Sequence, residues 1–261
     1  MKQIPFKNTL FFNGQGPLMI AKIGANGLPQ GFRHVGNCTE LAISPKTTSD
    51  DRKDSMTGQR ALIKKMTIEV GTDISFKLDS TMDNENLAMA LRATFAVKPA
   101  GTVTDEAVRA YKGCILPLAN ISIVDDVTLV VKSSDGLTTY DKGDDYTVSD
   151  HSLFIVPGGA IGLLDIADAG VALKIDYGYG KQTHFQPLTE AAQEYALRFE
   201  GLNTAEDNQA VVVNIFKVGT DVTKQFGMIT DKAVPLDISG AALLDPTKLT
   251  GSKFFTIQRA D

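Results

Sequence analysis

The stretch that decides the fold is Glu194-Tyr195-Ala196-Leu197-Arg198-Phe199-Glu200, in which apolar and polar side chains largely alternate. A period of two residues is typical of a β-strand with one face toward a core and the other toward water. The polar residues 201–208 then lead into a second apolar run, Gln209 to Lys217, so the two runs predict a long hairpin. We expect Tyr195, Leu197 and Phe199 to point into the core, and Glu194, Arg198 and Glu200 to point away from it.

Working outward from this hairpin, the same alternation recurs along the chain. Residues 38–44, 73–79 and 253–259 each place apolar side chains at every second position or in a short run bounded by turn residues. The sequence therefore predicts a mainly β protein.

Helical signals are few. Residues 84–92 predict one short helix, with Asp83 as its N-cap and with Leu87 and Leu91 on one face. A weaker helical pattern covers residues 105–111. A helix that is apolar almost all round is expected to pack on a sheet.

The middle of the chain has a different texture, because short apolar runs alternate with turns at the spacing of a small β-sandwich. We interpret residues 118–180 as an inserted β module. The remaining segments, 1–117 and 181–261, then form one discontinuous β core, since insertions of this kind succeed at surface loops.

Composition excludes several classes of protein. With 43% hydrophobic and 22% charged residues, the 261-residue chain is expected to fold. A net charge of −5 argues against a protein that grips nucleic acid, which needs a basic surface. Two cysteines give no disulfide framework, and no apolar run has the length of a membrane span, so we expect a protein made in a cytoplasm.

The sequence shows no motif of catalysis or cofactor binding. The three histidines, His34, His151 and His184, stand in no recognisable constellation, and the glycines of residues 158–162 lack the spacing of a phosphate loop. The acidic residues 79–85 begin like a calcium loop but lack its glycine and its final acid. We therefore predict no enzyme, no cofactor and no metal site.

One long polar stretch, residues 46–60, has no periodicity. Loops of this length in a compact domain are usually functional or disordered, and a solvated surface loop is the plain alternative.

Several segments together resemble bacteriophage tail tube (major tail) proteins in order and spacing. They are Gly36 to Pro45, Ser55 to Arg60, Ser75 to Leu91 and Glu194 to Asn203, while Gly143 to Val148 and the later strand pair ending at Tyr177 resemble the immunoglobulin-like insertion of some members. The resemblance implies a β-sandwich core with one flanking α-helix, and a small inserted immunoglobulin-like β module.

The resemblance also implies how the protein assembles. Subunits would form hexameric rings stacked into a tail tube, the conduit through which DNA is ejected without specific binding. In such proteins the long loop after the second core strand reaches the neighbouring ring, which here gives as inter-ring candidates Asp50, Asp51, Arg52, Lys53, Asp54, Ser55, Met56, Thr57 and Gly58. The wet faces of the core strands would line the channel, with the candidates Glu40, Asp73, Ser75, Lys77, Glu194, Arg198, Glu200 and Asn214.

The implied partners are further copies of the chain and other tail proteins: the tape measure, the baseplate or tip, the terminator and, in a contractile tail, the sheath. The implied location is the virion tail, assembled in the host bacterial cytoplasm, with no membrane partner. Two alternatives use the same β architecture, namely a tube subunit of a contractile injection or secretion system and a two-module β adhesin. A third is an enzyme whose carboxylates converge only in space.

Overall fold

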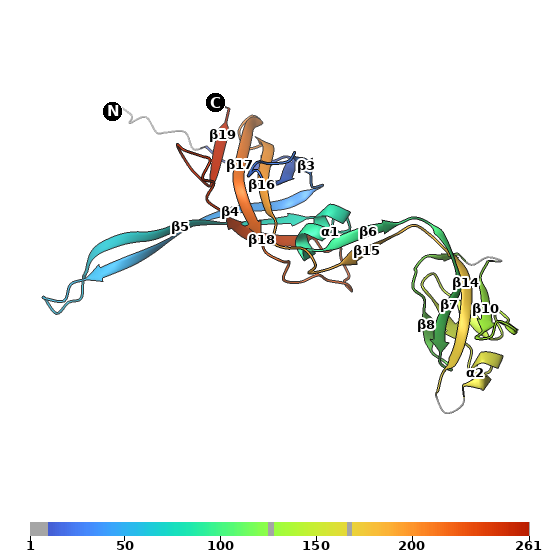
Figure 1. Ribbon diagram of the computed structural model, residues 1–261. Coiled ribbons are helices and arrows are strands. Elements are labelled where there is room, and N and C mark those ends of the chain that lie inside the picture. Colours follow the sequence, from blue (N-terminus) through green and yellow to red (C-terminus); the bar gives the residue numbers. More distant parts are fainter. Residues whose placement is uncertain (1–9, 125–127, 166–168, 261) are drawn as a thin grey trace. The chain divides into compact units, whose positions relative to one another are not determined.

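A computed structural model describes residues 10–124, 128–165 and 169–260 of the chain. The protein is mainly β, as the alternation predicts, and it divides into two compact units. Unit 1 contains residues 1–94 and 186–261, and unit 2 contains residues 95–185 (Figure 1).

Unit 1 is built on one nine-stranded sheet with the order β3-β2-β16-β17-β18-β5-β4, in which β1 also pairs with β16 and β19 with β17. Its strands are β1 (Gly14–Gln15), β2 (Leu18–Lys22), β3 (Arg33–His34), β4 (Cys38–Lys53), β5 (Leu62–Leu78), β16 (Glu194–Asn203), β17 (Gln209–Thr220), β18 (Leu236–Ala242) and β19 (Phe255–Arg259).

The hairpin predicted from the alternating stretch is confirmed as β16 and β17, which pair antiparallel. Tyr195 and Leu197 are buried in the core and Phe199 packs against it, as expected. β17 joins two parts of the sheet, because its first half pairs with β19 and its last residues pair with β18. Side chains from both parts, including Phe76 of β5, enter one hydrophobic core.

Helix α1 (Asn84–Leu91) confirms the predicted helix and its cap. The Asp83 carboxylate accepts a hydrogen bond from the Asn86 backbone N–H at 2.9 Å, which satisfies one of the free donors at the helix start. Asn86 itself is buried: its Nδ2 donates to the Val35 carbonyl at 2.9 Å and its Oδ1 accepts from Arg33 at 2.8 Å. The helix is thereby fixed to the start of the sheet.

Unit 2 has a core of its own, to which its five-stranded and three-stranded sheets both contribute. The first sheet has the order β11-β10-β14-β7 with β9 on β14, and the second has the order β12-β13-β8. The elements are β7 (Gly101–Ala110), β8 (Ile115–Pro117), β9 (Ile123–Val124), β10 (Val130–Ser133), β11 (Thr139–Tyr140), β12 (Tyr146–Val148), β13 (Ser152–Ile155), α2 (Ala160–Leu164) and β14 (Val171–Tyr179). A two-stranded ribbon of β6 (Thr94–Lys98) and β15 (Gln182–Gln186) forms the stem at which the chain leaves and re-enters unit 1.

The inserted unit begins earlier than residue 118, the boundary expected from the sequence. Residues 105–111 gave a weak helical pattern, but residues 105–110 belong to strand β7, which pairs with β14 along most of its length. Asp105 has a φ of 54°, and the register of β7 against β14 shifts there. This bulge breaks the period of two, so the spacing of apolar residues imitates a helix.

The polar residues 46–60 are also mostly strand, where the sequence predicted a loop. β4 continues to Lys53 and β5 begins at Leu62, so only residues 54–61 lie outside the two strands and form the turn between them. Nearly all of this part of the hairpin is solvent-exposed on both faces, and a strand without a buried face has no reason to alternate.

Replacing residues 95–185 by a short Gly-Ser bridge should leave unit 1 folded. The two ends of the excised segment are close, because the Thr94 N–H and hydroxyl lie 3.0 and 2.8 Å from the Thr189 hydroxyl. Thermal unfolding followed by near-UV circular dichroism should show one cooperative transition. The matched control removes only residues 118–180, which leaves β7 without β14 and exposes buried side chains of unit 2 such as Ala110; it should aggregate. The reverse result would contradict the observed boundary.

Candidate assembly surfaces

The most conspicuous surface of unit 1 is the outer part of the β4–β5 hairpin, residues 46–71, which we call the arm. Figure 1 shows it leaving the other strands of unit 1 as a free two-stranded ribbon. It begins where β5 loses its second neighbour, because β18 pairs with β5 only from Asp73 to Leu78. Beyond that point β4 is the sole strand paired with β5 among the described residues.

The two strands of the arm differ in character. The β4 side, residues 46–53, contains no apolar side chain. The β5 side and the tip expose five large apolar side chains to solvent: Met56, Leu62, Ile63, Ile68 and Val70. The exposed fraction is 68% for Ile68 and 91% for Met56, so the described part of the chain leaves these side chains uncovered.

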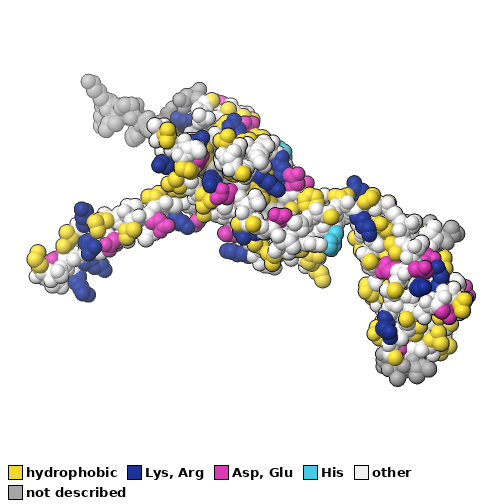
Figure 2. Space-filling view, in the orientation of Figure 1, with side chains coloured by type: hydrophobic (Ala, Val, Ile, Leu, Met, Phe, Trp, Pro, Cys, Tyr) yellow, Lys and Arg dark blue, Asp and Glu magenta, His cyan; other side chains and the backbone are white. Residues whose placement is uncertain are grey.

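The arm also differs in net charge from the rest of the chain. It carries six Lys and Arg and four Asp and Glu, whereas the whole chain has a net charge of −5. An arm of net charge +2 therefore extends from a remainder of net charge −7. Figure 2 shows dark blue Lys and Arg side chains near the outer end of the arm.

The tip of the arm is an ordered turn built on Asp54. Its Oδ1 accepts a hydrogen bond from the Met56 N–H at 2.8 Å, and its Oδ2 accepts from the Thr57 N–H at 3.2 Å and from the Thr57 hydroxyl. Bonds to the ionised carboxylate, above all that from the Thr57 hydroxyl, lower the pKa of Asp54. Of the nine residues predicted for an inter-ring loop, Asp50 to Lys53 thus lie in β4 and Asp54 to Gly58 in this turn.

The eight residues predicted to line a channel lie on polar faces of the sheet, but in two separate groups. The first group lies on β4 and β5, where Lys77 pairs with Glu40 at 2.7 Å, Asp73 pairs with Lys46 at 2.7 Å, and Ser75 lies between. These hydrogen-bonded pairings raise the pKa of Lys77 and of Lys46.

The second group lies on β16 and β17. The Arg198 guanidinium bonds both Glu200 and the Asn214 side chain, and Glu194 pairs with Lys217 at 2.7 Å. β5 and β16 both turn apolar side chains into the same core, so both polar groups lie on the opposite face of the sheet, with β18 and the end of β17 between them. The strand register connects the two groups, because Glu194 and Asp73 lie in one cross-strand row through residues 219 and 241.

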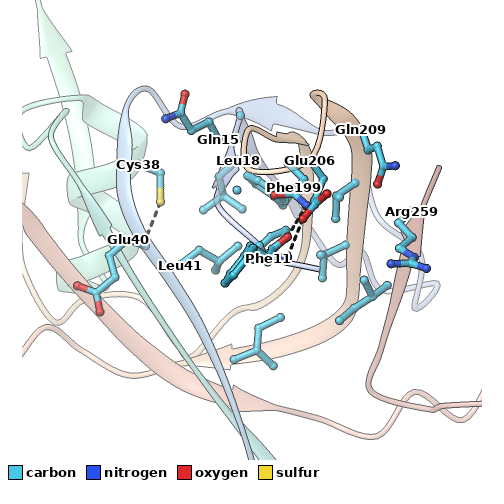
Figure 3. Close-up of a pocket in the computed structure, with 18 of the residues that line it drawn as sticks. Phe11, Gln15, Leu18, Cys38, Glu40, Leu41, Phe199, Glu206, Gln209 and Arg259 are labelled. Atoms are coloured by element: carbon cyan, nitrogen blue, oxygen red, sulfur yellow. Dashed lines mark hydrogen bonds between the residues drawn. The ribbon is translucent and has the colours of Figure 1, made fainter. Parts of the chain in front are cut away.

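A groove of about 830 Å³ opens into the core of unit 1 between β4 and the strands β16, β17 and β19 (Figure 3). Its apolar lining comes from the beginning of the described chain and from the sheet: Leu10, Phe11, Phe12, Leu18, Leu41, Ile43, Phe199, Val211, Val213 and Ile257. Val213 and Ile257 are direct cross-strand partners, yet Val213 is 8% exposed and Ile257 is 63% exposed. One side of the core is therefore left uncovered along β19.

Polar groups stand around the opening of this groove. The Cys38 thiol lies at the β4 side and donates to the Glu40 carbonyl at 3.1 Å, and burial raises its pKa. Glu206 fixes the beginning of the described chain by accepting from the Phe11 N–H at 2.8 Å. Figure 3 shows Leu41 and Phe199 pointing into the same space, with Phe11 nearby.

No three side chains of His, Cys, Asp or Glu in the described ranges stand together as a metal site. His34, His151 and His184 are all exposed and lie in β3, in the turn before β13 and in β15. Across the same ranges, no helix has the length and hydrophobicity that crossing a bilayer requires.

Sequence reasoning missed the groove and the apolar side of the arm. The groove joins residues near positions 40, 200 and 257, and only the sheet topology brings these together. The apolar arm had a visible signal in Leu62, Ile63, Ile68 and Val70, which follow a polar stretch and precede the core strand.

A family model matches residues 11–258, and the chain belongs to that family, described as "Protein of unknown function UCP028589". No curated protein matches the chain at a significant level. The match spans both units.

The turn at the tip of the arm should titrate as one unit. Because the pKa of Asp54 is lower in the folded chain than in the unfolded one, the hydrogen bonds are fully present above about pH 4 and are lost as the pH falls through the folded-state pKa. The amide resonances of Met56 and Thr57 should shift together below the ordinary aspartate range in NMR spectra, and Asp54→Asn should abolish this titration. Amides that titrate at or above the ordinary aspartate pKa would contradict the assignment.

Proposed function

We propose that this chain is a structural subunit that polymerises into stacked rings and forms a tube of the phage tail type, the conduit for DNA ejection. The observation that carries the proposal is the arm, a two-stranded ribbon that exposes five large apolar side chains. The proposal treats these side chains as contacts to another copy.

Physical chemistry supports a partner for the arm. An isolated two-stranded hairpin is at best marginally stable in water, since it buries little surface to offset the entropy of ordering it. Exposed apolar side chains grouped on one element are typical of an interaction surface. Packing against a neighbouring subunit would bury these apolar side chains and stabilise the ribbon.

Ring closure has a natural site at the edge strand β4. It is the last strand in the order of the unit 1 sheet, so its outer edge presents backbone donors and acceptors to a neighbour. Pro45 lacks an N–H and interrupts that edge near the base of the arm. We infer that lateral contacts between subunits use the part of β4 before Pro45.

The same edge selects one of the two polar groups as the channel wall. If copies join at β4, the face that carries Glu40, Asp73, Ser75 and Lys77 continues from one subunit to the next. With two acids and one base, these candidates have a net charge of −1 per subunit, which disfavours binding of phosphates. The group on β16 and β17 lies on the same face of the sheet but farther from the joining edge.

The proposed tube would also have other tail proteins as partners. A tube of this kind would be assembled in the bacterial cytoplasm and would contact the tape measure, tip or baseplate, terminator and, in a contractile tail, sheath proteins. It would need no cofactor, and DNA would pass along its wall without specific binding.

Shortening the arm should separate folding from stacking. Residues 49–68 are replaced by Asn-Gly, which joins the cross-strand partners Thr48 and Glu69 through a two-residue turn. The subunit should remain folded, because every core residue lies outside the removed segment, but electron microscopy should show no tubes. The variant that lacks residues 95–185 is the control and should still form tubes. Tubes from the shortened arm would contradict the proposal.

Charge reversal should identify the channel wall. Changing Glu40 and Asp73 to Lys should slow DNA ejection from assembled particles at low ionic strength, and added salt should restore the rate by screening the phosphate contacts. The matched pair, Glu194 and Glu200 changed to Lys, should slow ejection less, because these residues lie farther from the edge at which the copies join. If the second pair is slow and the first is normal, the channel wall lies on β16 and β17.

A further inference from the structure

The geometry points to a specific receptor for the arm: we propose that the groove between β4 and β19 of one copy receives the arm of another copy, head to tail. This inference rests on the proposed function in requiring self-association, and it adds the surface on which the arm docks.

The lining and volume of the groove suit an apolar occupant. Most of its apolar lining on the sheet belongs to, or packs against, the core of unit 1, and polar side chains such as Glu40, Glu206 and Arg259 also line it. Its volume of about 830 Å³ falls within the range of about 300 to 1,000 Å³ that is usual for sites enclosing a ligand. Ile257 stands beside the buried Val213 and remains exposed, so an apolar occupant would complete the burial of this pair.

The arm has the complementary character on one side only. Its exposed apolar side chains come from β5 and the tip, whereas residues 46–53 of β4 are polar throughout. The β5 side can therefore enter an apolar groove while the β4 side stays in water. This division fits a ribbon that inserts along one edge better than a ribbon that lies between two apolar surfaces.

Charge favours the same pairing. The arm has a net charge of +2, whereas the rest of unit 1, which carries the groove, has a net charge of −2 and unit 2 has a net charge of −5, so the arm of one copy is attracted to unit 1 of another. Two arms, in contrast, would repel each other. Electrostatics thus disfavours an arm-to-arm dimer.

A contact of this kind joins two different surfaces, so it does not close on itself. Each copy can offer its arm to one neighbour and its groove to another, and such heterologous contacts generate rings or open stacks. The proposed contact therefore propagates, as the stacking of a tube requires.

The test uses one variant for each half of the contact. Ile257→Asp places a carboxylate in the groove at an exposed position, and its control is Gln258→Asp, the next residue on β19, which pairs with Val212. Ile68→Asp does the same on the β5 side of the arm, and its control is Thr48→Asp on the β4 side. Circular dichroism and thermal melts should show wild-type folding in all four variants.

Alone, Ile257→Asp and Ile68→Asp should each raise the concentration needed for half-maximal assembly by at least about tenfold, because an unpaired charge would be buried at the contact. Both controls should assemble as the wild type does. Mixed together, the two defective variants retain one intact groove and one intact arm. Light scattering should then show particles of twice the mass formed by either variant alone, and nothing larger.

A cysteine scan checks the contact without placing charge in it. In a Cys114→Ser background, the substitutions Leu62→Cys, Ile68→Cys and Val70→Cys are tested singly for disulfides to the natural Cys38 of the groove. At least one should give a ladder of covalent oligomers on a non-reducing gel, and Cys38→Ser should abolish that ladder.

Three outcomes would overturn the inference. They are normal assembly of Ile257→Asp, covalent dimers without a ladder, and the absence of a disulfide at all three positions while tubes still form. In each case the tube function could still stand, with another surface receiving the arm. If the mixed variants pair but the wild type forms neither rings nor tubes, the receptor is correct and the proposed function is wrong.

Discussion

Two strands that leave a sheet together have no third element to bury their side chains. This constraint explains why unit 1 exposes apolar side chains on the arm. Within the sheet, β5 lies between β4 and β18, and its residues Ile74, Phe76 and Leu78 are buried. Past Asp73 the same strand has one neighbour, and Val70, Ile68 and Leu62 are exposed. The apolar content of β5 continues although its cover ends, so the cover is most simply supplied by another molecule.

At the groove, too, apolar side chains of unit 1 lack a covering element in the part of the chain that the structure describes. β19 pairs with β17 and extends the sheet, but no strand in the described ranges covers Ile257. A core that is closed by its own chain would bury this side chain together with its partner Val213. Unit 1 thus exposes apolar side chains on the arm and leaves apolar side chains uncovered at the groove. A contact between the arm of one copy and the groove of another would bury both sets.

The elements that the sequence predicted correctly are those in which burial dictates the pattern. In β16, Tyr195 and Leu197 are buried and Glu200 is exposed, so alternation is enforced by the core. The cap of α1 could be predicted because a carboxylate before a helix has a local partner, here the Asn86 N–H. The outer part of β4 and strand β7 were mispredicted for physical reasons: the first has no buried face, and the second is interrupted by a bulge at Asp105. The candidate channel residues lie on the polar face of the sheet, but their separation by β18 and the end of β17 follows from sheet topology, which alternation alone does not encode.

Self-association is the claim on which the other proposals depend, and electron microscopy of the purified full-length chain tests it most directly. The account predicts rings of uniform diameter that stack into tubes as the protein concentration rises. It also predicts that high salt raises the protein concentration at which stacking begins, because an arm of net charge +2 docks on the rest of unit 1, whose net charge is −2. A chain that stays monomeric and folded at every concentration and ionic strength would contradict the account.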